Sequence, residues 1–384
     1  MSLMLTWLRA FLRWPYAFAV CLSLAVGATA IYFSQDLNVG LKDPEGFLGP
    51  AYIRLPLIGV GIFAVALAPQ AIQRYGLRHT FSGMRRIVRD EWTWKRVAYA
   101  ATGMLSFYVC YVSYRNLKSY LPLIGGDTIH DRALFELDHF LFFGNNPAEV
   151  LHGFFGTTVT AQVLAVLYVL YLPFVPITVG AVLVLHRDLT VGAWYATAVS
   201  LNWVLGTISY YSLPSLGPAF YEPQRFADLP DNGATQLQNS LFRGAFGFKE
   251  DPQGDKIFGI AGFASLHVSV VFTLALFLHY AGLARAIRYT AWVYLGFTIL
   301  ATLYLGWHYI ADDIGGLAIG WLAVMIGAWV TGNSKWQKRR RAAAEQARQD
   351  EAAVERTDTD YDALPPAVES VAVDEPSALT PRSS

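Results

Sequence analysis

The chain has 384 residues, of which 54% are hydrophobic and only 15% charged, and its formal net charge is zero. Soluble domains carry about 25% charged residues, so this composition indicates a membrane protein. The neutral net charge gives no sign of nucleic-acid binding, and we expect no nucleic-acid partner. The two cysteines, Cys21 and Cys110, lie in apolar runs, so we expect buried thiols and no disulfide framework.

Apolar runs of spanning length recur along the chain. A transmembrane helix needs about 20 mainly apolar residues, and about eight runs qualify or nearly qualify: roughly 15–33, 52–70, 97–117, 157–185, 191–212, 264–281, 287–306 and 309–331. The fourth run is long and contains Pro173 and Pro176, which predict a kink or a tilt. The expected fold class is therefore all-α, a polytopic membrane helix bundle.

We expect three parts along the chain. Residues 1–96 hold two spans and a basic segment, residues 97–333 hold the other six spans, and residues 334–384 are acidic and rich in Ala, Pro and Ser. This last part lacks apolar periodicity, which predicts a disordered tail. An Ala-Thr-Ala motif at 28–30 resembles a signal-peptidase site, but the apolar run is longer than a usual signal sequence, so we expect a retained anchor.

Every second loop is rich in Lys and Arg, and so are both flanks of the membrane region. The positive-inside rule then predicts a multi-pass protein of the cell membrane with both termini in the cytoplasm. The long intervening loops lie on the extracytoplasmic side: 34–51, 118–156 and 213–263. The basic segment 73–96 contains Trp92 and Trp94, which predict an interfacial helix held on anionic lipid headgroups.

Polar residues interrupt the last apolar span in "GWHYIADDIGG" (306–316). His308 and Asp312 are four residues apart, so we expect them on one helix face, where the carboxylate fixes and stabilises the imidazole. Asp313 points about 100° away and is the weaker partner. Three glycines of this span allow another helix to approach closely: Gly315, Gly316 and Gly320.

A second histidine, His267, stands at the start of another span in "GIAGFASLHVSVVF" (259–272). Ser265 lies near the same helix start, where free backbone N–H groups favour an anion. The topology brings both histidines and Asp312 to one membrane depth. Two histidines and one aspartate are a weak ligand set for zinc, so we expect no metal. A purely structural pair, or a proton relay, is the alternative interpretation.

"FASLHVS", followed about forty residues later by "GWHYIADDIGG", resembles the type 2 phosphatidic acid phosphatase superfamily. More closely it resembles the branch that holds inositol phosphorylceramide synthase, which shows F-P-S-L-H-S and then H-Y-x-x-D-x-x-G-G. Residues 115–151 and 210–223 are similar to segments of that branch as well. The resemblance implies a six-helix core and a metal-independent double displacement without a cofactor. It assigns His308 as the nucleophile, Asp312 as its orienting partner, and His267 as general acid and then base.

The sequence departs from the family pattern at four places, one of which is Leu266, where the wider superfamily has glycine. Ala264 replaces a usual proline, Thr302 replaces an arginine, and the first motif is not recognisable. We therefore expect Lys118 and Arg115 to bind the phosphate. Other basic residues of the 213–263 loop are weaker candidates: Arg225, Arg243, Lys249 and Lys256. Further hydrogen-bond donors to the substrate are expected from two hydroxyl side chains: Tyr211 and Ser265.

The expected function is an integral membrane lipid-phosphate phosphotransferase or phosphatase that acts at the outer leaflet. Its partners are a lipid phosphate donor, water or a polyol such as inositol as acceptor, and membrane lipids, with no obligatory protein partner. The resemblance favours transfer to a polyol over hydrolysis. One alternative is a transport or structural membrane protein; transporters often carry internal repeats, and we find no repeat in this sequence. A second alternative is a protein that keeps the fold but is non-catalytic.

Overall fold

A computed structural model describes residues 14–43, 51–125 and 128–335, with the isolated positions 11, 342 and 346 and with the backbone alone at 51, 52 and 54–56. Within these residues the chain is helical and contains no strand. The chain divides into two units, residues 1–334 and 335–384. The predicted disordered tail and most of its basic flank lie outside the described residues, so that prediction stays open.

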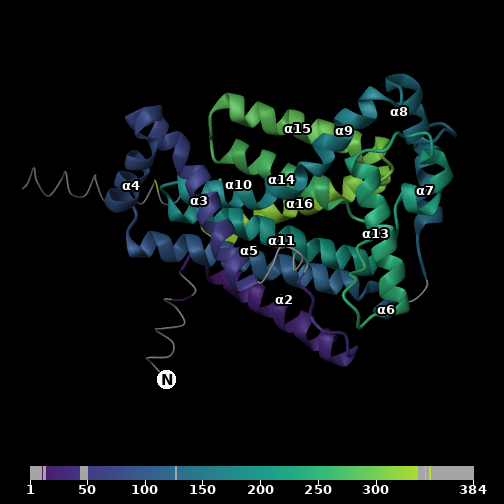
Figure 1. Ribbon diagram of the computed structural model, residues 1–384, viewed down its shortest axis with the longest axis horizontal. Helices are drawn as coiled ribbons and strands as arrows, with labels where there is room; N and C mark the ends of the chain where they lie inside the picture. Colours follow the sequence, from purple (N-terminus) through teal and green to yellow (C-terminus); the bar gives the residue numbers. More distant parts are fainter. Residues whose placement is uncertain are drawn as a thin grey trace, which may run out of the picture. The chain divides into compact units, whose positions relative to one another are not determined.

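Every expected span is a helix or a pair of helices, and the long helices lie side by side (Figure 1). Their bounds are α2 (Ala17–Asp36), α3 (Ala51–Tyr75), α5 (Trp94–Ser119), α9 (Val159–Val169) with α10 (Tyr171–Leu185), α11 (Leu189–Ser212), α14 (Leu266–Tyr280), α15 (Arg285–Tyr304) and α16 (Ile310–Val330). Five stretches are long and apolar enough to cross a membrane: α2, Leu57–Tyr75 of α3, α9 with α10, α15 and α16. The fold is a polytopic membrane helix bundle, as predicted.

Three further helices of the bundle, α5, α11 and α14, do not meet these limits of length and apolar composition. Helix α14 is apolar but has only 15 residues. Helix α11 is buried along most of its length, with neighbours that include α5, α14 and α16. A helix enclosed by protein need not present an apolar surface to lipid.

The fourth expected span breaks where its prolines predict. Helix α9 ends at Val169, and α10 begins at Tyr171. Pro173 has no N–H to donate to the carbonyl four residues earlier, which is that of Val169. Pro176 lies inside α10. The break matters for the site described below, because Tyr168 and Tyr171 lie on either side of it.

The expected outer loops contain short helices that gather at one end of the bundle (Figure 1). These are α6 (Leu121–Ile124), α7 (Asp131–Leu141), α8 (Pro147–Phe155), α12 (Pro218–Tyr221), η3 (Pro223–Phe226) and α13 (Gly233–Glu250). Local sequence fixes the starts of α8 and α13, because Asn146 and Asn232 each accept a hydrogen bond from a backbone N–H of the helix that follows. The opposite end carries η2 (Leu77–His79) and α4 (Thr80–Glu91), within the predicted interfacial segment.

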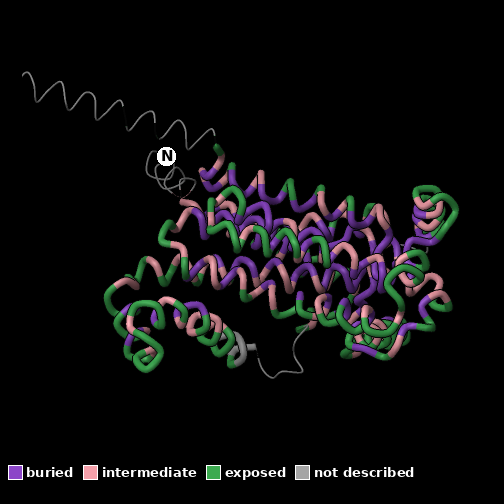
Figure 2. The backbone as a smooth tube through the Cα atoms, turned by 90° about the horizontal axis from the view of Figure 1, so that it is seen from above, coloured by how far each residue is buried: buried purple, intermediate pink, exposed green. Residues whose placement is uncertain are grey.

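Helices α14 and α16 pack closely against each other. Buried residues fill the centre of the bundle (Figure 2). A Cβ at Gly316 would clash with the carbonyl oxygen of Ser265, and one at Gly320 would lie 2.6 Å from that of Ser269. The predicted close approach of another helix to these glycines is confirmed. Cys110 is buried as expected, but Cys21 is exposed on α2, so the expectation of a buried Cys21 thiol was wrong. An outer membrane helix places apolar residues towards lipid as well as towards the core.

Candidate active site

His308 lies in the turn between α15 and α16, one residue before the N-cap Tyr309. Its Nδ1 lies 3.3 Å from Asp312 Oδ2, so the predicted contact is present. The reason is different from the predicted one, because His308 is not on the face of a helix. Asp312 occupies the first turn of α16, where its Oδ2 also accepts a hydrogen bond from the N–H of Tyr309 at 3.0 Å. The same carboxylate oxygen thus caps the start of α16 and contacts the His308 imidazole.

Thr302, which stands where the family has an arginine, faces a carboxylate. Its hydroxyl donates to Asp313 Oδ2 at 2.8 Å, and both residues are buried. Its carbonyl accepts hydrogen bonds from the N–H groups of Trp307 and His308. Thr302 therefore holds the turn that carries His308, and positive charge at the site has to come from another element.

His267 belongs to the first turn of α14, and its ring lies between two tyrosine rings. The ring centroids are 4.1 Å from Tyr168, nearly parallel, and 4.0 Å from Tyr171. His267 Nδ1 lies 3.4 Å from the Tyr168 hydroxyl, whereas its buried Nε2 has no hydrogen-bond partner among the described residues. The centroids of the His267 and His308 rings are 6.4 Å apart. The structure thus brings together two histidines that are far apart in sequence.

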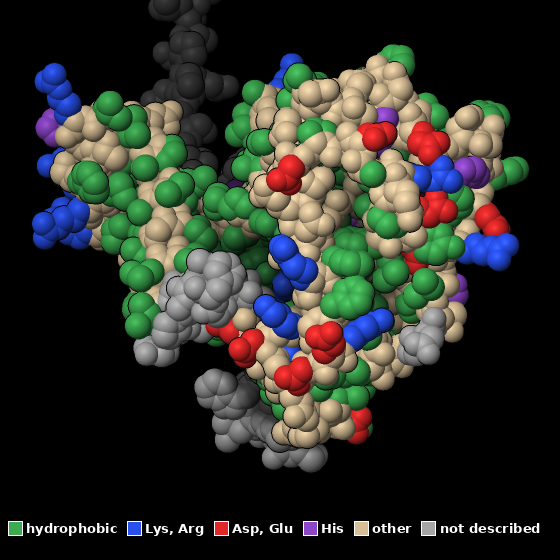
Figure 3. Space-filling view, turned by 45° about the vertical axis from the view of Figure 1, so that its right-hand side comes forward, with side chains coloured by type: hydrophobic (Ala, Val, Ile, Leu, Met, Phe, Trp, Pro, Cys, Tyr) green, Lys and Arg blue, Asp and Glu red, His purple; other side chains and the backbone are tan. Residues whose placement is uncertain are grey.

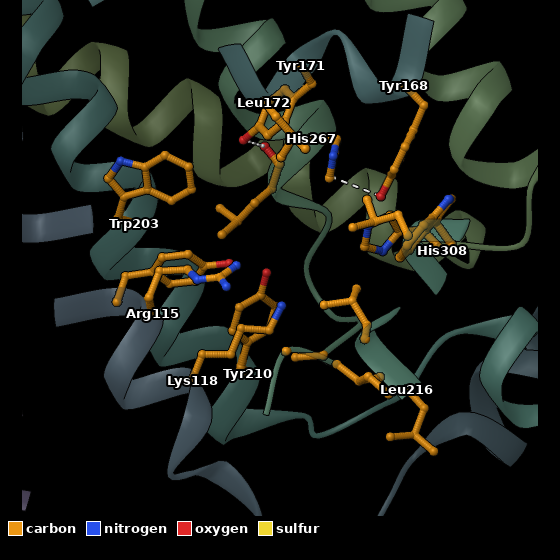
Figure 4. A pocket seen from close by; sticks show the side chains of 18 of the residues that line it. Arg115, Lys118, Tyr168, Tyr171, Leu172, Trp203, Tyr210, Leu216, His267 and His308 are labelled. Atoms are coloured by element: carbon orange, nitrogen blue, oxygen red, sulfur yellow. Dashed lines mark hydrogen bonds between the residues drawn. The ribbon is translucent and has the colours of Figure 1, made fainter. Parts of the chain in front are cut away.

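Both histidines line a cavity of about 140 Å³. Aromatic and apolar side chains supply most of its wall, and Figure 4 shows how they surround the histidines and two cations. The lining residues are Tyr111, Tyr114, Arg115, Lys118, Tyr168, Tyr171, Leu172, Trp203, Tyr210, Leu216, Phe220, Leu237, Leu241, Gly259, Ile260, Ala261, Leu266, His267, Trp307 and His308. The segment 213–263 contributes seven of these lining residues: Leu216, Phe220, Leu237, Leu241, Gly259, Ile260 and Ala261.

Arg115 and Lys118 supply the positive charge of the cavity. They lie in the last turns of α5, and the Lys118 ammonium sits 4.9 Å from the centre of the Tyr210 ring. Neither cation forms an ion pair with a carboxylate within the described ranges, and Arg115 Nε is buried without an acceptor. A buried cation without a carboxylate is costly. The cavity is therefore suited to an anion.

The other expected ligands do not reach this cavity. Arg225 pairs with Glu149 and Glu222, and Arg243, Lys249 and Lys256 are absent from the wall. Tyr211 donates its hydroxyl to the backbone of Leu117 at 2.6 Å, and its neighbour Tyr210 lines the cavity instead.

Ser265 is fully buried, and its hydroxyl caps α14 by accepting from the N–H of Val268. Its own N–H donates to the carbonyl of Asp312 at 2.9 Å. Ser265 therefore joins the two histidine-bearing motifs but lies behind the cavity wall.

Two aspartates of α7 support the site from outside the bundle, and the sequence did not single them out. Asp131 accepts hydrogen bonds from the N–H groups of Leu216 and Gly217 and from the Tyr309 hydroxyl. Asp138 accepts one from the N–H of Ile310 at 3.1 Å. Burial, with Asp312 and Asp313 nearby, raises the pKa of Asp138 to about 7.

Gly217 lets this support come close to the site. Its φ of 97° lies in the region that favours glycine, and a Cβ there would clash with the carbonyl oxygen of Trp307. Helix α7 and the segment after α11 are thus tied to the residues next to His308.

The fold and the cavity define a polytopic helical membrane protein with two histidines, a carboxylate and two cavity-lining cations at one end of the bundle. A family model described as the PAP2 superfamily matches residues 132–326, slightly more than half of the chain. The chain belongs to the PAP2 superfamily, and this membership suggests a phosphatase-type or phosphotransferase-type function. No curated protein and no solved structure gives a significant match. The described residues hold no cluster of His, Cys, Asp or Glu able to bind a metal ion.

Proposed function

We propose that the protein is a lipid-phosphate phosphotransferase or phosphatase whose reaction passes through a phosphohistidine. The observation that carries the proposal is the pair of histidine rings 6.4 Å apart beside two cations that have no carboxylate partner among the described residues. Reacting atoms approach to about 3–3.5 Å before attack, and a general acid acts within about 2.6–3.2 Å. The two rings line the same cavity, so both can contact one phosphoryl group.

His308 is the nucleophile in this proposal. Asp312 faces its Nδ1, so the proton resides there and the lone pair of Nε2 is available. Nε2 attacks phosphorus, a P–N bond forms, and the bond from phosphorus to the lipid oxygen breaks. His267 donates a proton to that departing oxygen from the opposite side.

The second half of the reaction returns both histidines to their starting state. A hydroxyl of the acceptor gives its proton to His267 and attacks phosphorus, and the P–N bond breaks. Arg115 and Lys118 stabilise the charged phosphoryl oxygens in both steps. The acceptor is water in a phosphatase and a polyol in a transferase, and the resemblance of the motifs to inositol phosphorylceramide synthase favours the polyol.

The lipid donor approaches from the extracytoplasmic side in this proposal. The basic segments cluster at the other end of the helices, and α13 contributes Leu237 and Leu241 to the cavity wall. The exposed rings of Phe242 and Phe246 on the same helix offer an apolar surface to lipid. An acyl or prenyl chain would lie against such a surface while its phosphate occupies the cavity.

Turnover with defined lipids tests the proposal. The purified protein in detergent is given phosphatidate, a prenyl pyrophosphate or phosphatidylinositol, with EDTA present, and both phosphate release and headgroup transfer are followed. We expect activity to survive the chelator, His308→Ala to abolish it, and Asp312→Asn and His267→Ala to lower it by roughly a hundredfold or more.

The matched control is His279→Ala, which changes an exposed histidine at the far end of α14 and should leave turnover unchanged. Unchanged turnover in His308→Ala would remove the mechanism. If no lipid phosphate is turned over, the result would favour the transport or structural alternative.

A further inference from the structure

A second group of arginines surrounds one carboxylate at the other end of α5. A crevice of about 460 Å³ is lined by Glu91, Thr93, Arg96, Arg187 and Leu189. Glu91 pairs with Arg74 and lies 3.7 Å from the guanidinium of Arg187. Two guanidinium groups, those of Arg74 and Arg187, therefore share one carboxylate. Arg96 lines the same crevice and donates to the backbone carbonyl of Glu91, which leaves the crevice with an excess of positive charge.

The arginine at the base of the crevice has unused hydrogen-bonding capacity. Arg96 donates to the carbonyl of Val184 at 2.8 Å and stacks 4.5 Å from the centre of the Trp92 ring. Its Nε is buried and has no acceptor among the described residues, and the same holds for the ring N–H of Trp92. Buried donors without a partner are costly and indicate a missing acceptor.

This crevice lies at the opposite membrane face from the cavity. Helix α5 has 26 residues, which at 1.5 Å per residue is about 39 Å, longer than the hydrocarbon core of about 30 Å. Arg96 belongs to its first turn and Lys118 to its last. The two basic groups thus reach different headgroup layers.

Exposed apolar side chains accompany the positive charge at this end. Leu77, Phe81 and Trp94 are 76%, 88% and 83% exposed. Exposed arginines of η2 and α4 add to the positive charge: Arg78, Arg85, Arg86 and Arg89. Figure 3 shows Lys and Arg side chains gathered with hydrophobic ones at the left edge of the molecule. A soluble anion needs only the charge, whereas a phospholipid needs both kinds of surface.

We propose that the crevice formed by Glu91, Arg96 and Arg187 binds the phosphate headgroup of an anionic phospholipid. The lipid phosphate accepts hydrogen bonds from Arg96 and Arg187, and the acyl chains lie along the exposed apolar side chains. Glu91 opposes the headgroup electrostatically, so it limits the affinity of the crevice. This binding is independent of the reaction in the cavity.

Lipid binding to the full chain in detergent tests this site. Native mass spectrometry is used to count phosphatidylglycerol and phosphatidylcholine bound to the wild type and to variants at 0.15 M ionic strength. A micelle has no bilayer surface potential, so direct contacts decide the result. Because a charge-assisted hydrogen bond is worth roughly tenfold in affinity, we expect Arg187→Gln to bind phosphatidylglycerol several-fold more weakly and Arg96→Gln with Arg187→Gln more than tenfold more weakly. Glu91→Gln should bind it more tightly.

The matched control is Arg85→Gln with Arg86→Gln, which removes the same charge from α4 but not from the crevice. We expect this pair to change binding less than twofold. Equal losses in the crevice pair and the control pair would overturn the proposal, because they would show only a general attraction to a basic surface. Equal binding of phosphatidylcholine, or full displacement by inorganic phosphate, would overturn it too. Arg187 is exposed and lies outside the helices, so its single variant keeps the test valid if Arg96→Gln fails to fold.

Discussion

The two ends of α5 hold positive charge under different conditions. At the cavity end, Arg115 and Lys118 lie among aromatic rings, and the described residues offer them no carboxylate. At the other end, Arg74 and Arg187 share Glu91 and are more exposed to solvent. The comparison shows that burial determines whether a cation requires an anionic partner. An exposed arginine needs no partner, whereas a buried one without a carboxylate needs a bound anion to balance its charge.

The largest effect should come from removing the two cations of the cavity. Lys118→Met with Arg115→Met keeps apolar bulk in the cavity but removes both charges that stabilise the transferred group. We expect kcat/KM for a lipid phosphate to fall by roughly a thousandfold, since one donor to developing charge is worth about a hundredfold or more. Steady-state kinetics in detergent measure this.

The matched control at the other end of the same helix is Lys95→Met, which should change kcat/KM less than twofold. Equal losses in the two variants would contradict the distinction between the ends of α5. A higher KM with an unchanged kcat would assign the cations to substrate binding only.

A smaller effect is expected from the support behind His308. Asp131→Asn weakens the hydrogen bonds to the 216–217 backbone and to the Tyr309 hydroxyl. A small displacement of a reacting group costs rate, so we expect kcat to fall about tenfold with little change in KM. Tyr309→Phe should give part of the same loss.

Asp188→Ala is the control for stability at the other end of the bundle. Asp188 caps α11 by accepting from the N–H of Thr190, and its loss should cost about 1 kcal/mol of stability. Turnover should nevertheless stay unchanged. A reduced kcat in this variant would mean that general destabilisation explains the Asp131 result as well.

The smallest effect concerns pH and Asp138. Its pKa in the folded protein is about 7, above the unfolded value of about 3.9. The folded state therefore holds an extra proton between roughly pH 4 and pH 7, and stability falls as the pH rises through that window. We expect the apparent Tm of the wild type to fall more between pH 5 and pH 8 than that of Asp138→Asn. Identical pH slopes would exclude this role.

Local patterns in the sequence were sufficient for the helices and for the two motifs. Apolar length marks a membrane span, and the break near Leu170 follows from Pro173. His267, His308 and Asp312 stand out because polar groups are rare in apolar helices. Arg115 and Lys118 stand out because they end an apolar helix. All five residues meet at one place in the structure.

Features that depend on distant contacts were not predictable. Asp138 meets Ile310, which is 172 positions away in sequence, and no local pattern records such a pairing. Tyr168 and Tyr171 resemble ordinary core residues until the His267 ring is placed between them. The choice between Tyr210 and Tyr211 depends on the rotation of α11, since neighbouring residues of a helix point about 100° apart. To predict that Asp312 caps α16, the position of the helix start would have to be known to within one residue.

The central claim is that His308 carries the phosphoryl group, and trapping of that intermediate tests it most directly. The protein is mixed with a lipid phosphate labelled on the transferred group, quenched within milliseconds under alkaline conditions, digested, and mapped by mass spectrometry. The account predicts a phosphorylated peptide whose modification lies on His308, absent in His308→Asn and present in His279→Ala. Continued turnover with no labelled histidine, or a label that persists in His308→Asn, would contradict it.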